Sequence, residues 1–362
     1  MIDFWPELFG SGAGASVQVT LRVVRKSGRP FLLLPDDPQL AAQAMDLYPA
    51  QKITARAAKL MLRCALRCNL PLPLARVSSG LVADEPFPKF LASLTERVFP
   101  PLALLAGNPG TEGRRFVILL FGADKKPAAV VKAGTRGRAA QLVEAEAEFL
   151  KIVPAGTPGV PKLRDTFRSD GVSALALDFF GGDSPRGDDL APAGLLAAWI
   201  DASRSVRVDE IPAWRRLAAA CRSHELFAKL ANRMGGQAVH PTIFHGDFAP
   251  WNIKVRGETW TVLDWERGET TGVPLWDWLH FFIQSAILTR GERAGVIAER
   301  VQRFLSSQQF SVYAEKSRIA GIGRELVLAY LIHCIKVLQP SEGVAQLRAL
   351  LASLASRWCF TA

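Results

Sequence analysis

One stretch, residues 242–268, interrupts the second half of the chain, where apolar residues otherwise repeat at helical spacing. Its sequence is TIFHGDFAPWNIKVRGETWTVLDWERG, and the segments NIKV and TWTVLDW alternate around RGE. Period-two alternation on either side of a short turn is typical of a β-hairpin. The second half is therefore predicted to be mainly helical, with one polar loop and one hairpin set into it.

The middle of the chain has the pattern of a small antiparallel sheet. Three apolar runs are separated by the turn sequences GNPGTEG and GADKKP, at residues 102–105, 116–121 and 128–131. Short strands joined by tight turns form a meander. A segment rich in helix formers follows at 138–153, and a further apolar run, 174–180, ends at a pair of glycines.

The amino-terminal segment has a pattern of its own. Strands are predicted at 16–24 and 29–35, and a helical segment at 37–67, with Asp37 at its start. The proline-rich stretch 69–90 is interpreted as a connection.

Together these patterns predict an α+β chain with three segments. Residues 1–95 form an amino-terminal α/β extension of unknown role, 96–182 a small lobe of sheet with one helix, and 183–362 a larger, mainly helical lobe. A cleft is expected between the two lobes, and ligands bind in clefts of this kind.

The loop HGDFAPWN, residues 245–252, has the residue spacing of a kinase catalytic loop. In that loop an Asn lies five positions after an Asp, as Asn252 does after Asp247. Asp264 follows the hairpin, where protein kinases have a metal-binding Asp, and Lys132 in AVVKA ends a predicted strand upstream. A turn rich in Asp and Asn would explain the loop by itself. It would not explain why Lys132 lies before the loop and Asp264 after it, in the chain order that kinases have.

These motifs resemble those of the aminoglycoside phosphotransferase and choline-kinase-like family of small-molecule kinases. That family carries H-G-D-x-x-x-x-N, a short hairpin and D-x-[DE], and the resemblance covers about residues 100–285. It implies a bilobal protein-kinase-like fold, ATP and Mg²⁺ as cofactors, and a small molecule whose hydroxyl accepts the phosphoryl group. Asp247 would accept or orient the proton of that hydroxyl, and Asn252 and Asp264 would hold Mg²⁺ through oxygen ligands.

The resemblance also implies how the nucleotide would be bound. Lys132 would contact the phosphates that are not transferred, and a glutamate of the following helix would hold the lysine in an ion pair. Glu146 is the favoured partner, and Glu144 and Glu148 are the alternatives.

Four further residues are candidates for nucleotide binding. Gly107 and Gly110 lie in GNPGTEG, where a loop that covers the phosphates belongs. The chain has no G-x-G-x-x-G there, and a plain hairpin turn explains the two glycines equally well. Asp178 and Phe179 fall at the expected hinge, whose backbone would contact the adenine.

Other residues near the loop are expected to support it. His245 would brace the loop rather than react, Gly246 would allow a close approach of the backbone, and Pro250 would stiffen the loop. Asp277 would cap or brace a helix beside it. Glu266 is either a second metal ligand or a surface acid.

The formal net charge is +10, with basic residues spread along the chain rather than gathered in one run. This spread disfavours nucleic acid as the partner, which remains an alternative only for residues 1–95. For the acceptor, the charge favours a neutral or anionic compound, such as a sugar, a glycan precursor or a lipid headgroup, over a polycation.

A cytoplasmic location without a membrane span is expected. The five cysteines are odd in number and form no C-x-x-C, which favours reduced thiols. The amino terminus has no basic segment before an apolar run, and no apolar run approaches the ~20 residues of a membrane span.

Two other functions compete with a small-molecule kinase. A catalytically inactive nucleotide-binding protein with a regulatory or scaffold role is disfavoured, because Asp247, Asn252 and Asp264 are all present. A protein kinase needs a long activation segment that ends in A-P-E, whereas here the short ERGETTGVPLWDW takes its place.

Overall fold

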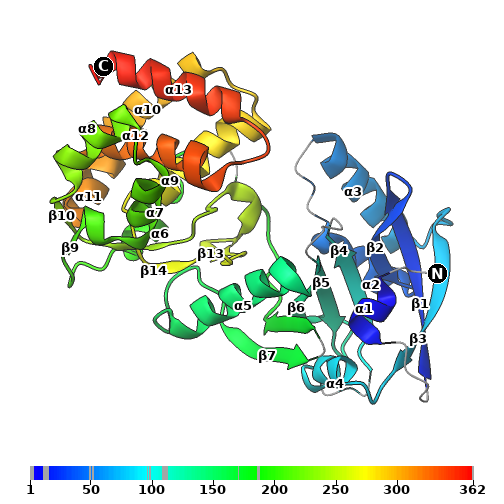
Figure 1. Ribbon diagram of the computed structural model, residues 1–362. Coiled ribbons are helices and arrows are strands. Elements are labelled where there is room, and N and C mark those ends of the chain that lie inside the picture. Colours follow the sequence, from blue (N-terminus) through cyan, green and yellow to red (C-terminus); the bar gives the residue numbers. More distant parts are fainter. Residues whose placement is uncertain are drawn as a thin grey trace. The chain divides into compact units, whose positions relative to one another are not determined.

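The structure is a computed structural model, which describes the following parts of the chain: residues 4–10, 16–48, 50, 53–95, 97, 99–107, 113–169, 171–185 and 188–360. The chain divides into two compact units, whose elements are labelled in Figure 1. The first unit consists of Met1–Lys151 and Pro161–Gly181, and the second of Ile152–Val160 and Gly182–Ala362.

The first unit is built on one sheet of eight strands among the described residues, in the order β3-β1-β2-β4-β5-β6-β8-β7. Every neighbouring pair in it is antiparallel. The strands are β1 (Ser16–Lys26), β2 (Arg29–Pro35), β3 (Ala75–Val82), β4 (Leu102–Ala106), β5 (Arg114–Phe121), β6 (Pro127–Thr135), β7 (Leu163–Ser169) and β8 (Val172–Leu177). The predicted meander is confirmed as β4-β5-β6.

The sheet continues across the predicted division between residues 95 and 96. The link is the β2–β4 pair, in which Leu33 lies opposite Leu104. The strands of the amino-terminal segment and those of the expected small lobe therefore form a single layer. That layer is covered by five α-helices among the described residues. Four of them lie in residues 1–95, and α5 (Gly137–Ile152) is the one helix predicted for residues 96–182.

The interpretation of 69–90 as a connection is wrong. Ala75–Val82 forms β3, which pairs with β1, and Pro86–Ser93 forms the helix α4. The prolines lie outside the strand, where they remove no hydrogen bond from the ladder. β3 is also an edge strand in which half of the residues are exposed and several are small or polar, so its apolar alternation is weak.

Helices cover both faces of the sheet. One face packs against α1 (Trp5–Phe9) and α4, whose aromatic residues share a cluster with the strands. The other packs against α2 (Pro38–Ala44) and α3 (Ile53–Arg67), which are joined through a 3-10 turn, Met45–Leu47. As expected, Asp37 begins the predicted helical segment: its side chain accepts hydrogen bonds from the first turn of α2.

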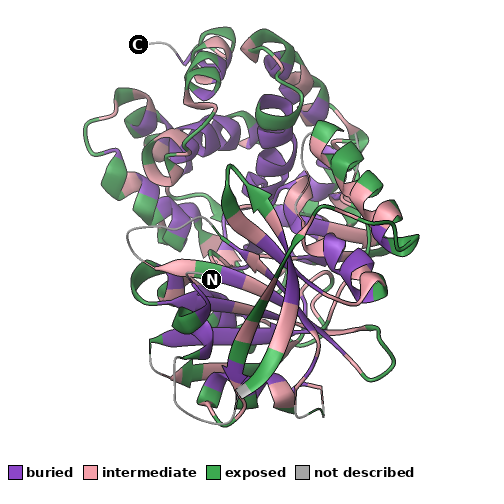
Figure 2. Ribbon diagram, turned by 90° about the vertical axis from the view of Figure 1, so that its right-hand side faces the viewer, coloured by how far each residue is buried: buried purple, intermediate pink, exposed green. Residues whose placement is uncertain are grey.

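Burial follows this layering. β8 is buried along its whole length, whereas the edge strands β3 and β7 consist mostly of exposed and half-buried residues. Figure 2 shows buried and exposed segments of the molecule in purple and green. A further helix, α5 (Gly137–Ile152), lies against β6. A Cβ added to Gly134 of that strand would be 2.2 Å from the carbonyl oxygen of Ala139, so glycine is required for the close packing.

The second unit is mainly helical, as predicted. Its α-helices are α6 (Ala193–Ala198), α7 (Pro212–Ala220), α8 (Glu225–Met234), α9 (Trp276–Gln284), α10 (Ala294–Leu305), α11 (Gln308–Ser317), α12 (Gly323–His333) and α13 (Val344–Arg357). Two of them, α9 and α12, continue into π-helical turns, Ser285–Thr289 and Cys334–Leu338. Two 3-10 turns are formed by Val208–Glu210 and Pro250–Asn252.

Three short antiparallel strand pairs accompany the helices. They are β9 (Val206–Arg207) with β10 (Ala238–Val239), β11 (Thr242–Phe244) with β14 (Glu269–Gly272), and β12 (Ile253–Arg256) with β13 (Thr259–Val262). The last pair confirms the predicted hairpin, although its second strand ends before the LDW sequence.

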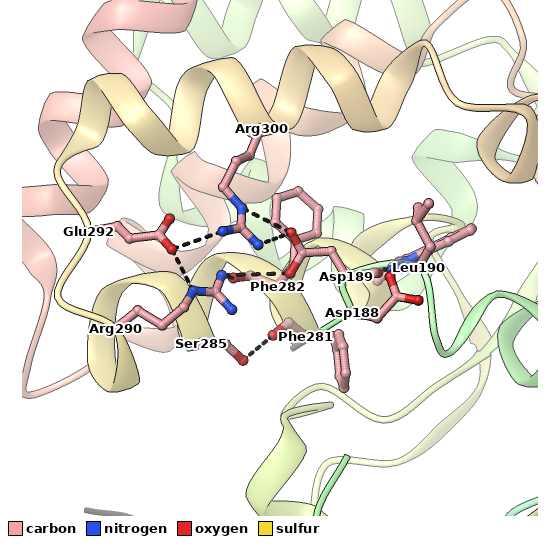
Figure 3. Close-up of polar contacts among 10 residues, drawn as sticks. Asp188, Asp189, Leu190, Phe281, Phe282, Ser285, Arg290, Glu292 and Arg300 are labelled. Carbon is pink, nitrogen blue, oxygen red and sulfur yellow. Dashed lines mark hydrogen bonds and ion pairs between the residues drawn. The ribbon is translucent and has the colours of Figure 1, made fainter. Parts of the chain in front are cut away.

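An ion-pair network ties the segment before α6 to α9 and α10 (Figure 3). Asp189 lies 3.0 Å from Nε of Arg300 and 3.6 Å from Nη2 of Arg290. Glu292 accepts hydrogen bonds from both arginines, at 2.6 Å and 2.9 Å. Trp278 of α9 donates its indole N–H to the carbonyl oxygen of Asp189, at 2.8 Å. The network anchors α9, which also carries two residues of the candidate site.

All five cysteines are unpaired, in agreement with the expectation of thiols. Cys221 and Cys334 are buried, and the other three are exposed. Within the part of the chain that the structure describes, no helix is long and apolar enough to span a membrane.

Candidate active site

The loop HGDFAPWN begins where β11 ends and leads through the 3-10 turn Pro250–Asn252 into β12. Gly246 has a φ of 77°, and a Cβ added there would lie 3.0 Å from Cβ of Arg267. Both the left-handed backbone and the lack of space require glycine at this position. The expected close approach of the backbone at Gly246 is thus found, and it places Arg267 against the loop.

His245 is fully buried and holds the loop together. Its Nε2 lies 2.9 Å from the carbonyl oxygen of Leu263, and its Nδ1 accepts a hydrogen bond from the backbone N–H of Asp247, at 3.2 Å. These contacts suit a neutral imidazole that carries its proton on Nε2. Burial lowers the pKa of His245 to about 4, so the ring stays neutral and acts as a brace, as the sequence indicates.

Asp277, in the first turn of α9, binds the backbone of the same loop. Its two carboxylate oxygens accept hydrogen bonds from the N–H groups of His245, at 2.6 Å, and Gly246, at 3.0 Å. Burial raises the pKa of Asp277 to about 7, although these two hydrogen bonds oppose the rise. Asp277 therefore binds the backbone of the loop itself, whereas the sequence analysis expected it to cap or brace a helix beside the loop.

Asp247 has a half-buried carboxylate that is held between two donors. Its Oδ1 lies 3.0 Å from Nε2 of His280, and its Oδ2 accepts a hydrogen bond from Nδ2 of Asn252, at 3.0 Å. Burial raises the pKa of Asp247, but the interactions with His280 and the charge of Arg267 contribute to a net lowering below the usual value. The carboxylate is therefore ionised at neutral pH and fixed in orientation.

His280 is a residue of the site that the sequence analysis missed. It lies on α9, and its second ring nitrogen, Nδ1, is 3.2 Å from the hydroxyl of Tyr330 on α12. Both side chains are buried. His280 follows Asp277 by three positions, so the two side chains share one side of the helix. This spacing was the one feature of the sequence that could have indicated His280.

The hairpin brings Asn252 and Asp264 to its open end. Ile253 pairs with Val262, and beyond that pair the N–H of Leu263 donates to the carbonyl oxygen of Asn252, at 2.7 Å. Asp264 is the next residue, and its backbone has a φ of 73°. Asp is one of the few residues that adopt this left-handed conformation with any frequency, and such positions cluster at functional sites.

These two residues suit a magnesium ion. Among the described residues, no group of three or more His, Cys, Asp or Glu side chains is arranged to hold a metal. Mg²⁺ at kinase sites takes only one or two protein ligands and completes its shell with phosphates and waters. An amide oxygen from Asn252 and a carboxylate from Asp264 form a donor set of that kind.

Lys132 and Glu146 form an ion pair in the first unit. Nζ of Lys132, on β6, lies 2.7 Å and 2.8 Å from the two carboxylate oxygens of Glu146, on α5. The side chains are 14% and 3% exposed. The other candidates have different partners: Glu144 accepts from Ser173, at 2.6 Å, and Glu148 pairs with Lys151, at 2.8 Å.

The remaining candidates are supported less directly. Gly107 donates its N–H to the carbonyl oxygen of Arg115, at 2.8 Å, which closes the β4–β5 hairpin, and a Cβ added there would lie 2.8 Å from the same oxygen. Gly110 lies outside the described residues. Asp178 is 3.6 Å from Arg164, and Phe179 packs against the apolar cluster of α2 and α3. Their expected contacts with a nucleotide stay predictions.

No family model and no curated protein matches the chain, but solved structures do. A thermostable mutant of aminoglycoside phosphotransferase APH(4)-Ia is 14% identical with a TM-score of 0.46, over 71% of this chain and 95% of that one. A putative aminoglycoside phosphotransferase from Ralstonia eutropha JMP134 is 12% identical with a TM-score of 0.46, over 75% and 96%. A putative fructosamine-3-kinase from Haemophilus somnus 129PT is 14% identical with a TM-score of 0.44, over 74% and 95%. These similar structures carry the names of small-molecule kinases, the class that the sequence resembles.

Proposed function

We propose that this chain is a magnesium- and nucleotide-dependent kinase that phosphorylates a hydroxyl group of a small molecule. The observation that carries the proposal is the environment of Asp247, an ionised, half-buried carboxylate whose two oxygens are fixed by Asn252 and His280. A fixed carboxylate next to two oxygen ligands for a metal is what phosphoryl transfer requires of a protein.

In this reaction Asp247 accepts the proton of the acceptor hydroxyl. The hydroxyl oxygen forms a bond to the γ-phosphorus, and the bond from that phosphorus to the bridging oxygen breaks, which leaves a nucleoside diphosphate. The carboxylate can take this role because its pKa is lowered, so that it is free of a proton at neutral pH. His245 and Asp277 hold the loop but do not face a proton transfer, because their polar atoms are bound to backbone groups.

Asn252 and Asp264 would hold Mg²⁺, which, when bound, neutralises the charge that develops on the phosphates. Lys132 would bind the phosphates that stay on the nucleotide. Its pairing with the buried Glu146 supports this role, since the carboxylate fixes the direction of a long, flexible side chain. ATP is the proposed donor.

Replacement of Asp247 tests the role of the carboxylate. Asp247→Asn keeps the shape of the side chain but removes its capacity to accept the proton. General-base catalysis contributes roughly 10²–10⁴-fold, so we expect ADP formation to fall by at least about 100-fold while magnesium–ATP still binds. An Asp247→Asn protein that forms ADP at the wild-type rate would rule out this function. Loss of activity together with retained binding would also separate an active kinase from the alternative of an inactive nucleotide-binding protein.

A further inference from the structure

Several buried polar atoms next to the candidate catalytic loop have no hydrogen-bond partner. Six buried side-chain atoms in the described residues are unpaired, and four of them belong to three residues near the candidate catalytic loop. These four are Oε2 of Glu269, Nε1 of Trp276 and both ring nitrogens of His333. Trp276 is 1% exposed and His333 2%. Buried polar groups in folded proteins almost always have partners, so such a cluster requires an explanation.

The three residues lie close to the loop that carries Asp247. Trp276 directly precedes Asp277, whose carboxylate binds the loop backbone. The ring of His333 is centred 4.6 Å from that of Trp276. Glu269 lies opposite Phe244 in the β11–β14 pair, and Phe244 is the residue directly before the loop.

Two arginines contribute positive charge to this cluster. Arg216, on α7, forms an ion pair with the other carboxylate oxygen of Glu269. Arg267 is exposed, and its Cβ is the atom closest to a Cβ added at Gly246 of the loop. Burial lowers the pKa of His333 to about 3, and the charges of Arg216, His280 and Arg267 contribute to the lowering, so these groups act on the imidazole together.

Hydrogen-bond donors outnumber acceptors among the side chains of this cluster and its two arginines. Two guanidinium groups, the indole N–H and one imidazole N–H can donate, whereas the free oxygen of Glu269 and the second imidazole nitrogen can accept. Arginine is the side chain that binds carboxylate and phosphate oxygens most readily, through paired N–H groups.

We propose that Arg216, Arg267, Trp276 and His333 bind an anionic group, a carboxylate or a phosphate, of the small molecule whose hydroxyl is phosphorylated. Glu269 accepts a hydrogen bond from a further hydroxyl of the same molecule. The acceptor is thus an anionic, hydroxylated compound, which narrows the neutral or anionic class expected from the net charge. This assignment rests on the proposed kinase function, because it takes the compound near Asp247 to be the acceptor.

The anion site can be tested without knowledge of the acceptor, with inorganic phosphate as the probe. The chain has only five histidines, so the ring signals of histidine-labelled protein can be followed individually by NMR. At constant ionic strength, phosphate should shift the His333 signals in a saturable way. Arg267→Gln should raise the half-saturating concentration about tenfold. The matched control is Arg256→Gln, the same change at an exposed arginine of β12, and it should leave the titration unchanged.

Replacement of the imidazole gives a second test. His333→Phe keeps a planar ring against Trp276 but removes both unpaired nitrogens. We expect its melting temperature to be equal to or higher than that of the wild type, and its remaining histidine signals to show no saturable response to phosphate. A clear loss of stability in His333→Phe would show that an internal water or another structural partner uses these nitrogens, and would overturn the proposal.

Two further outcomes would contradict the assignment. One is a phosphate titration in which the His333 signals show no saturable shift, or in which Arg267→Gln does not change the half-saturating concentration. The other is a saturable response to spermidine in place of phosphate, which would indicate a polycationic acceptor. If phosphate fails while magnesium–ATP still stabilises the protein, only the acceptor class is wrong. If phosphate binds but magnesium–ATP has no effect, the kinase function is wrong and the anion site serves another purpose.

Discussion

At the scale of single residues, the candidate site depends on how Asp247 is held. Both of its carboxylate oxygens receive a hydrogen bond, from Asn252 and from His280, and the backbone of its loop is bound by Asp277. His280 is in turn in contact with the hydroxyl of Tyr330. The carboxylate is therefore oriented by Asn252 of its own loop and by His280 of α9.

Removal of the His280 donor should reduce catalysis more than binding. A hydrogen bond to a charged group contributes roughly 1.5–3 kcal/mol, so His280→Leu should lower kcat about 10–100-fold with little change in the KM for ATP. The acidic limb of the pH profile should move to higher pH, because Asp247 loses a donor that lowers its pKa. His280→Gln, which can still donate, should recover part of the activity. A His280→Leu protein whose kcat and pH profile match the wild type would show that His280 has no positioning role.

The buried His245 should make folding sensitive to pH. Its folded pKa, about 4, is below the usual 6.5, so the unfolded chain binds a proton that the folded chain does not. The contribution of His245 is complete above about pH 6.5 and is lost as the pH falls toward 4, by up to about 3 kcal/mol. In His245→Gln the unfolding free energy, measured with urea at each pH, should depend less on pH across that range. An unchanged slope would contradict the assignment of a neutral, buried imidazole.

The spacing in HGDFAPWN was sufficient to predict Asp247, Asn252 and the brace at His245, because all three lie on one short segment. It could not reveal His280, since the contact with Asp247 joins residues 33 positions apart and depends on how α9 packs. The unpaired His333 was hidden for the same reason: its neighbours come from other elements. Short-range patterns show chemistry within a loop and miss the chemistry that tertiary packing brings to it.

At the scale of elements, β6 and α5 form the candidate nucleotide-binding pair. Val131 and Ala133 belong to the cluster on one face of the sheet, so the alternation of the strand places Lys132 on the opposite face. Glu146 is buried on α5 and pairs with it there. The sequence predicted this helix and the favoured glutamate, but three glutamates at alternate positions left the pairing open until the packing was known.

Loss of the buried carboxylate should weaken both nucleotide binding and the fold. In Glu146→Gln the ammonium group of Lys132 stays partly buried without its counter-charge, and disruption of a buried pair destabilises a protein by roughly 3–5 kcal/mol. We expect a lower melting temperature and a rise of about tenfold in the Kd for ATP, measured by calorimetry below the melting range.

Glu148→Gln is the matched control for that change. Glu148 lies on the same helix, and its ion pair with Lys151 is solvent-exposed, so its loss should change stability by no more than about 1 kcal/mol and leave ATP binding intact. Equal effects of the two substitutions would show that the Lys132–Glu146 pair has no special part in binding nucleotide.

At the scale of the whole molecule, the amino-terminal segment is part of a sheet rather than an appendage. β1, β2 and β3 share one layer and one apolar cluster with β4, β5 and β6. The sequence predicted most of these strands separately, but a proline-rich stretch hid β3 and suggested a boundary. Which strands pair across a long separation is decided by packing, so local patterns reveal strands more readily than the sheet they form.

The central claim also concerns the whole molecule: we propose that the chain binds a nucleotide through Mg²⁺. The direct test is the melting temperature of the protein with and without ATP and Mg²⁺, for the wild type and for Asp264→Ala. A ligand at 100 times its Kd stabilises a protein by about 2.7 kcal/mol, a shift of roughly a few degrees. We predict a shift that needs both ATP and Mg²⁺, is lost in Asp264→Ala and persists in Glu258→Ala, an exposed acid in the turn of the same hairpin. No shift under any condition, or the same shift in Asp264→Ala as in the wild type, would contradict this account of the site.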